Sequence, residues 1–218
     1  MTDIWRYFTN HWDEISGWLR TTVWLAALPL VIGLAIALPV GWIAHRYRWT
    51  YPPIVSGAGL LYTIPSLVLF FVLPGILGTK ILDTKNVGVA LTIYTFALLV
   101  RIVADALSAV SADTMSAAAA MGYTQLQQLL KVQLPIAVPV IGAGLRVAAV
   151  SNVSLISIAS IIGVSQLGRL FVDGFNLNTT TPTIVGLILF VLLALVFDAL
   201  ILLGIRLLTP WQRAVQAR

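Results

Sequence analysis

Two charged side chains, Arg146 and Asp198, interrupt stretches of sequence that are otherwise almost entirely apolar. A charge inside such a stretch is costly in lipid and is usually paired or functional. Arg146 lies eleven residues past Pro135 and Asp198 lies eight residues before Arg206, which places the charges about 16 Å and about 12 Å along their helices. The similar depths predict a structural ion pair between two helices rather than a substrate ligand. The alternative is that Arg146 extends along its helix to the lipid headgroups.

The remaining residues with reactive or metal-binding side chains form no catalytic or metal-ligating set. The two histidines, His11 and His45, fall on opposite sides of the first long apolar stretch and cannot meet, and cysteine is absent, which excludes a thiolate metal site. The GILGTK run at residues 75–80 has the wrong spacing for a phosphate-binding loop, and no strand precedes it. We therefore expect no enzyme and no cofactor or metal site in this chain, so any ATP hydrolysis must belong to another polypeptide.

The elements that must position the two charges are long apolar helices. Of the 218 residues, 59% are hydrophobic and 10% are charged, and the mean hydropathy is +0.97. Soluble domains carry roughly 25% charged residues, so the composition indicates lipid as the solvent. A crossing needs about 20 apolar residues, which predicts an all-α integral membrane protein with about five transmembrane helices in one domain, residues 1–218. The predicted spans are 23–44, 54–77, 87–100 (continued through Arg101 and Asp105 toward Val110), 136–164 and 183–205.

Ahead of the first predicted span, apolar side chains recur at helical spacing, with Asp13 and Glu14 off that stripe. Such a stripe suits a helix in the membrane interface, where tryptophan is favoured. It suits an extension of the first span equally well. The stripe consists of Ile4, Trp5, Phe8, Trp12, Ile15 and Leu19.

Five crossings place the two termini on opposite sides of the membrane. Basic residues favour the cytoplasmic side, and they number seven against five when the C-terminus is inside. We therefore predict an N-terminus outside, a cytoplasmic C-terminus, and residues 111–135 in the cytoplasm. The basic residues are scattered beside hydrophobic spans, which does not favour nucleic acid as a partner. The cytoplasmic set is Arg46, Arg48, Arg101, Lys131, Arg206, Arg213 and Arg218, and the outer set is Arg6, Arg20, Lys80, Lys85 and Arg169.

Residues 111–135 are a fairly polar segment between the third and fourth predicted spans. Asp113 can cap a short helix over residues 114–121, and Gly122 can end it, as a C-terminal glycine often does. Thr124 fits a capping box with the glutamine three residues later. The pattern predicts two short helices that meet at a glycine.

The second of these helices carries an apolar face, and Pro135 ends it or opens the next span. An amphipathic element of this kind can lie flat on the membrane. It can equally dock into a groove on a soluble partner. The apolar face consists of Leu126, Leu129, Leu130 and Leu134.

The same segment resembles the signature of permease subunits of bacterial ABC importers, which reads Glu-Ala-Ala, three residues, Gly, nine residues, Ile-x-Leu-Pro. Val132 is a mild replacement for the isoleucine, whereas Ser116 stands where the family usually has glutamate and so removes a charge at the domain contact. The resemblance implies that this segment is the coupling helix that docks into a cleft on a separate ATPase. The positions compared are Ser116, Ala117, Ala118, Gly122, Val132, Leu134 and Pro135.

Roughly residues 20–208 resemble the osmoprotectant branch of this family, which imports glycine betaine, choline and carnitine. The YTIPSL run at residues 62–67 is similar to an element of that branch's second span, and residues 134–146 resemble the stretch after its coupling helix. Residues 162–168 resemble an Ile-Gly-x-Gly-Gly-Leu-Gly turn, with departures at 164–166. Methionine-type permeases share parts of the pattern. Candidate path-lining residues are Tyr62, Pro65, Ser66, Phe70 and Tyr94.

The sequence thus predicts the transmembrane subunit of an ATP-driven importer in the bacterial inner membrane. This subunit is expected to catalyse no reaction itself. The resemblance implies three partners besides the lipid bilayer: cytoplasmic ATPases that hold ATP and Mg²⁺, a second permease copy or paralogue, and an extracytoplasmic substrate-binding protein. Alternatives are a methionine- or amino-acid-type permease, an ion-coupled carrier or channel using Asp198, and a structural membrane scaffold.

Overall fold

Every regular element in the computed structural model, which describes residues 2–211, is a helix. Residues 1 and 212–218 lie outside the described part, and with them Arg213 and Arg218 of the basic-residue count. The elements are α1 (Thr2–Asn10), α2 (Trp12–Arg46), α3 (Tyr51–Thr63), α4 (Ser66–Leu77), α5 (Thr84–Ser108), α6 (Ala112–Ala120), α7 (Gln125–Gln128), the π-helical turn η1 (Leu129–Gln133), α8 (Leu134–Ile158), α9 (Arg169–Asn176) and α10 (Thr180–Leu208).

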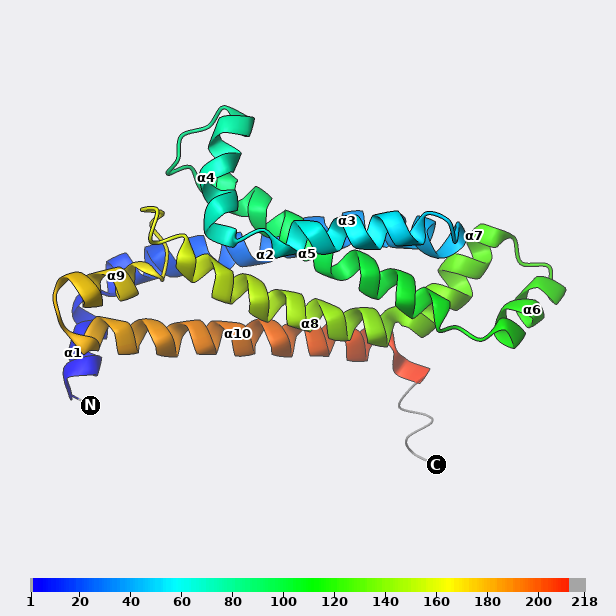
Figure 1. Ribbon diagram of the computed structural model, residues 1–218. Helices are drawn as coiled ribbons and strands as arrows, with labels where there is room; N and C mark the ends of the chain where they lie inside the picture. Colours follow the sequence, from blue (N-terminus) through cyan, green and yellow to red (C-terminus); the bar gives the residue numbers. More distant parts are fainter. Residues whose placement is uncertain (1, 212–218) are drawn as a thin grey trace.

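Four helical runs are long and apolar enough to cross a membrane: α2, α5, the continuous run Gln125–Ile158, and α10. The pair α3 and α4 passes the same test together, which gives four crossings, or five if the bent pair counts as one span. The all-helical membrane fold is therefore confirmed. The long helices lie side by side in one elongated bundle (Figure 1). The third predicted span is longer than its uncharged core, since α5 runs through Arg101 and Asp105 as expected.

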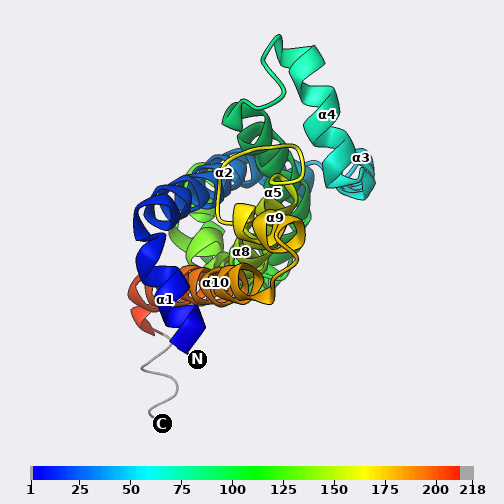
Figure 2. The ribbon, with the colours of Figure 1, turned by 90° about the vertical axis from the view of Figure 1, so that its left-hand side faces the viewer.

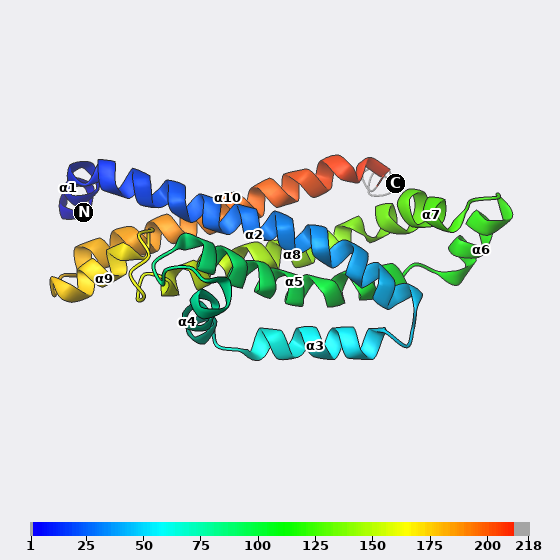
Figure 3. The ribbon, with the colours of Figure 1, turned by 90° about the horizontal axis from the view of Figure 1, so that it is seen from above.

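The second predicted span, residues 54–77, is divided between α3 and α4, which are bent by 101°. Proline disfavours the helical conformation in the residue before it, and Ile64 is extended, with φ −65° and ψ 127°. Pro65 also lacks the N–H that would continue the helix. Beyond the break, α4 turns away from the bundle while α3 runs alongside it (Figures 1 and 3).

Small side chains let α2 and α5 pack closely along their lengths. A Cβ atom on Gly33 would lie 2.6 Å from the Thr95 side chain, and one on Gly41 would lie 2.7 Å from Val103. Helix α8 packs against both α5 and α10. Viewed along its axis, the bundle gathers α2, α5, α8 and α10, and α3 and α4 lie outside it (Figure 2).

The N-terminal apolar stripe is divided between two helices, α1 and α2. Helix α2 already begins at Trp12, and Ile15 is fully buried. That half of the stripe extends the first span. The other half belongs to α1, a separate short helix that packs on α10.

The two ends of the bundle carry different elements, and we name them the α9 end and the α6 end (Figure 1). The α9 end holds α1, α9 and the turn at residues 159–168. The α6 end holds residues 111–135 and the last turns of α10. The fourth predicted span, residues 136–164, is wrong at its far end, because α8 stops at Ile158 and the chain turns through Gly163, whose φ is +90°.

Candidate functional site

Helix α6 of the 111–135 segment begins two residues earlier than the predicted cap implies. The Ser111 Oγ accepts a hydrogen bond from the Thr114 N–H at 3.3 Å, so Ser111 is the N-cap. The prediction of Asp113 as the cap is wrong. Asp113 lies in the first turn instead, where a negative charge is favourable to the helix dipole.

Gly122 separates the two short helices as predicted, with φ at +82°. The Gly122 N–H donates to the Ala119 carbonyl at 2.9 Å and the Tyr123 N–H donates to the Ala118 carbonyl at 3.2 Å. Residues other than glycine rarely adopt this left-handed backbone conformation. The turn between α6 and α7 therefore requires glycine at residue 122.

The predicted capping box starts α7. The Thr124 Oγ accepts from the Gln127 N–H at 3.4 Å, and the Gln127 Oε1 accepts from the Thr124 N–H at 2.9 Å. From there the chain remains helical through η1 and α8, so Pro135 stands within one continuous helical run. The π-helical turn directly before this proline widens the helix at the point where a backbone N–H is missing.

The 111–135 segment exposes apolar side chains at the α6 end, at the close of α6 and in the first turns of the run Gln125–Ile158. We call Met121, Leu126 and Leu130 the α6-end patch; they are 69%, 61% and 53% exposed. Of the other positions compared with the importer signature, Ser116 and Ala117 are exposed and Ala118 is buried. Val132, Leu134 and Pro135 are half-buried. The segment therefore has one face held by the protein and one face open.

The structure brings Arg146 and Asp198 together across α8 and α10. The Arg146 Nε donates to the Asp198 Oδ1 at 2.6 Å, and an Arg146 Nη donates to Oδ2 at 2.8 Å. This two-point geometry suits the planar guanidinium and carboxylate groups. The side chains remain 38% and 29% exposed. The guanidinium is thus engaged within the bundle rather than directed only to the headgroups.

The candidate path-lining residues cluster at the break between α3 and α4, with one exception. The Tyr94 hydroxyl donates to the Ile64 carbonyl, which satisfies a backbone group that the break releases. The Tyr62 ring meets the Tyr94 ring edge-on, with 5.7 Å between centroids. Tyr62 and Pro65 are exposed and Ser66 is half-buried. The exception is Phe70, which is fully buried and packs in the core instead of lining a path.

A groove of about 230 Å³ between α3 and α5 extends from Tyr62 to Arg101. Arg101 forms an ion pair with Asp105 at 3.5 Å, and the Tyr51 hydroxyl donates to Asp105 at 2.6 Å. Sequence analysis did not single out this group, although the four-residue spacing of Arg101 and Asp105 on one helix was visible.

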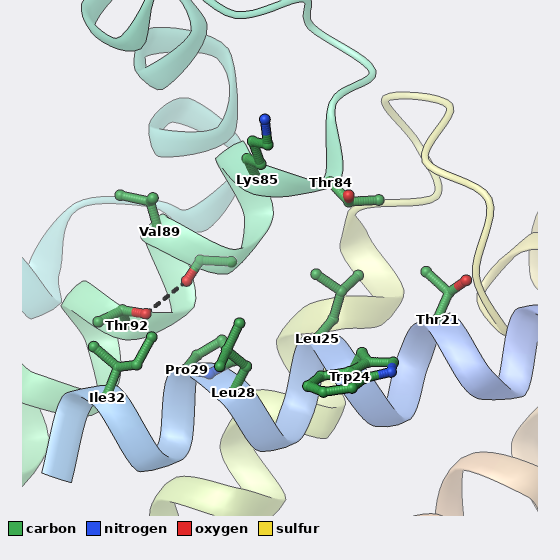
Figure 4. Close-up of a pocket in the computed structure, with 11 residues that line it drawn as sticks. Thr21, Trp24, Leu25, Leu28, Pro29, Ile32, Thr84, Lys85, Val89 and Thr92 are labelled. Atoms are coloured by element: carbon green, nitrogen blue, oxygen red, sulfur yellow. Dashed lines mark hydrogen bonds between the residues drawn. The ribbon is translucent and has the colours of Figure 1, made fainter. Parts of the chain in front are cut away.

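A second hollow, of about 510 Å³, lies between α2 and the first turns of α5 (Figure 4). It is bordered by Trp24 and Pro29 on α2 and by Val89 and Thr92 on α5, and the Lys85 ammonium is directed away from α2. It contains none of the candidate path-lining residues. Within residues 2–211 there is also no group of three or more acidic or histidine side chains placed to hold a metal ion.

Comparison with known proteins matches residues 30–206 to the family described as "Binding-protein-dependent transport system inner membrane component". The chain is 33% identical over 184 residues to the osmoprotectant import permease protein OsmW of Salmonella typhimurium, covering 82% of this chain and 84% of that protein. It is 28% identical to the choline transport system permease protein OpuBB of Bacillus subtilis, with coverages of 85% and 84%.

Among solved structures, the fold is similar to a chain of the MetNI methionine ABC transporter in an inward facing conformation. The TM-score is 0.79 and the identity 22%, and the match covers 89% of this chain and 96% of that one. At this identity the likeness concerns the fold alone.

Proposed function

This chain belongs to the family of inner membrane components of binding-protein-dependent transport systems, and from that premise we propose that it couples the import of an osmoprotectant to a separate ATPase. As an ABC importer permease it is a multi-pass protein of the inner membrane and a transport component rather than an enzyme. The proposed substrate class is quaternary ammonium compounds such as glycine betaine or choline. The names of the relatives OsmW and OpuBB support it.

The observation that carries the coupling role is the 111–135 segment. Two short helices meet at Gly122, whose backbone only glycine adopts readily. The α6-end patch leaves apolar side chains uncovered, which suits a helix that docks into a groove on a partner. We assign the docking face to Ser116, Ala117 and the α6-end patch. ATP and Mg²⁺ would be bound by the ATPase, and a second permease copy or paralogue would complete the passage.

The proposed orientation places the α6 end in the cytoplasm and α1 outside. Arg46 ends α2 and Arg48 follows it at the α6 end, and Lys131 lies in η1. Basic residues favour the cytoplasmic side. The ATPase would then meet the α6 end, and the external binding protein would meet the α9 end.

Selectivity is proposed to lie mainly in the external binding protein. Quaternary ammonium groups are recognised by several aromatic faces around one cation. In this chain Tyr94 is engaged with the Ile64 carbonyl, and Tyr62 is the exposed partner of that aromatic pair. The permease accordingly offers a path that binds substrate weakly and with low selectivity. We expect no tight saturable binding of betaine or choline to the permease–ATPase complex without the binding protein.

Uptake in cells that lack other osmoprotectant importers tests the proposal. The cells express this chain with its ATPase and binding protein, and they receive radiolabelled betaine, choline or methionine in separate assays. We expect uptake of betaine or choline that requires the ATPase. Uptake of methionine alone would favour the methionine-type alternative, and uptake that survives loss of the ATPase would favour the ion-coupled carrier.

A further inference from the structure

Three polar side chains from three elements meet at the α6 end. His45 lies in the last turn of α2, Ser108 ends α5, and Gln133 ends η1. The His45 Nδ1 lies 2.9 Å from the Ser108 Oγ, and the Gln133 Nε2 lies 3.2 Å from the His45 Nε2. We call these residues the His45 cluster. It joins segments that are up to 88 residues apart in the sequence.

The directions of the hydrogen bonds make one imidazole ring bridge two elements. The Gln133 amide nitrogen can only donate, so the His45 Nε2 accepts. The Ser108 hydroxyl donates to the Ala104 carbonyl at 2.8 Å, so the His45 Nδ1–H donates to Ser108. Turning the amide and moving the ring proton exchanges the roles: the Gln133 Oε1 then accepts from the His45 Nε2–H, and the Ser108 hydroxyl donates to Nδ1 instead of to the Ala104 carbonyl. The bridge therefore depends on the presence of the ring and not on one tautomer.

Gln133 lies at the end of the 111–135 segment, directly before α8. It is only 8% exposed, and a buried amide of this kind needs its hydrogen bonds. Helices α6 and α7 pack on each other and on η1 more than on the spans. Among the described residues, the His45 cluster is thus a direct polar link from the base of this segment to α2 and α5.

Helix α2, which carries His45, is itself held to α5 and to the start of α3. Helices α2 and α5 pack closely at Gly33 and Gly41, so the two move most easily as a unit. After α2, the Thr50 hydroxyl donates to the Tyr47 carbonyl at 2.7 Å and approaches the Ile43 carbonyl at 3.2 Å. These bonds fix the short turn into α3. A displacement at His45 would therefore reach three helices.

We propose that His45 is a positioning residue that transmits movement of the 111–135 segment to the α6-end termini of α2 and α5. This inference rests on the proposed function, in which an ATPase moves that segment. Without the ring, the segment would still dock and the ATPase would still turn over, but less of its movement would reach the passage.

The test is the number of substrate molecules transported per ATP hydrolysed, measured in proteoliposomes with the complete complex, its binding protein and radiolabelled betaine. This ratio is independent of how much complex assembles. We expect His45→Ala and Gln133→Ala each to lower it about two- to tenfold, the size expected for loss of a hydrogen bond. The double variant should lose no more than the larger single loss, because both act through one link. His45→Gln, which keeps a donor and an acceptor, should recover most of the ratio.

The matched control is His11→Ala, at the opposite end of the bundle. The His11 ring contacts the Tyr7 carbonyl of the preceding helix at 3.0 Å, and its removal should leave the ratio unchanged. A wild-type complex that transports normally while His45→Ala and Gln133→Ala keep the wild-type ratio would overturn the inference alone. Wild-type transport that needs no ATP would overturn the proposed function itself.

Discussion

The two ends of the bundle each connect long helices, but the connection is buried at the α9 end and exposed at the α6 end. At the α9 end, Gln166 is fully buried, donates to the Ile156 carbonyl at 2.9 Å and accepts from the Gly168 N–H at 2.6 Å. The buried Thr22 hydroxyl accepts from the Leu167 N–H at 3.0 Å. At the α6 end, α6 and its loop extend past the ends of α2 and α5 (Figure 3), and the α6-end patch is exposed.

The α9 end is thus fixed by buried hydrogen bonds, whereas the α6 end exposes a segment that a partner could bind. A buried and fully paired polar network fixes one arrangement of a turn, and the α9 end has such a network. The segment at the α6 end takes its conformation from local features, its helix caps and Gly122. It is joined to α2 and α5 through the His45 cluster. We therefore expect substitutions at the α9 end to change stability and substitutions at the α6 end to change coupling.

The largest effect on transport is expected from Gly122→Val. Valine would be strained at φ +82°, so the two short helices could not keep their arrangement and the ATPase could not dock. Uptake should fall to background while membrane insertion stays normal, because no span is altered. The control is Gly17→Val in α2, where a new side chain also meets open space but the backbone is helical. Normal uptake and normal ATPase pull-down by Gly122→Val would contradict the coupling role.

The largest effect on stability is expected from Gln166→Leu. The substitution leaves the Gly168 N–H and the Ile156 carbonyl without their partner in a buried turn, at a cost of about 1–3 kcal/mol. Thermal unfolding of the purified protein in detergent measures the loss. Gln125→Leu, at an exposed position in α7, is the comparison and should unfold at nearly the wild-type temperature. Equal losses for the two variants would erase the proposed difference between the ends.

A smaller effect is expected at the Arg146–Asp198 pair, which belongs to neither end. Arg146→Ala should lower the amount of assembled protein by leaving a carboxylate unpaired, and adding Asp198→Asn should recover much of it. The double-mutant comparison isolates the interaction. Simple addition of the two losses would mean that the pair contributes no interaction energy.

Cysteine labelling sharpens the comparison with the least disturbance. Because the chain contains no cysteine, single cysteines can be placed at Phe175, 86% exposed at the α9 end, and at Met121, 69% exposed at the α6 end. An impermeant maleimide added to intact cells with a permeable outer membrane should label Phe175→Cys and spare Met121→Cys. The reverse pattern would invert the proposed orientation.

Short-range features of the α6 end could be predicted from the sequence because their causes are local. A capping box and a helix-ending glycine act over three or four residues, so Thr124 and Gly122 were identified correctly. The prediction of Asp113 as a cap failed because serine caps helices as well as aspartate does, and Ser111 stands two residues earlier. The depth of a charge along a helix is likewise a local count, and it placed Arg146 and Asp198 at similar depths.

Long-range features could not be read in the same way. The Ile-Pro pair at residues 64–65 signals a break, but the direction in which α4 leaves the bundle depends on packing. Gln166 departs from the turn of the osmoprotectant permeases that the sequence resembles, yet it is the residue that pairs the buried backbone there. The contact between His45 and Gln133 joins separate helices, and no pattern in the sequence predicted it.

The most direct test of the account is retention of the ATPase by the purified permease. The α6-end patch is made polar by Met121→Gln, Leu126→Gln and Leu130→Gln in one variant, and three comparably exposed apolar residues at the α9 end, Ile161, Phe175 and Leu177, are changed to Gln in another. Both permeases carry an affinity tag and are purified with the co-expressed ATPase. We predict that the α6-end variant loses the ATPase and that the α9-end variant retains it. Wild-type retention by the α6-end variant would contradict the claim that this end is the docking site.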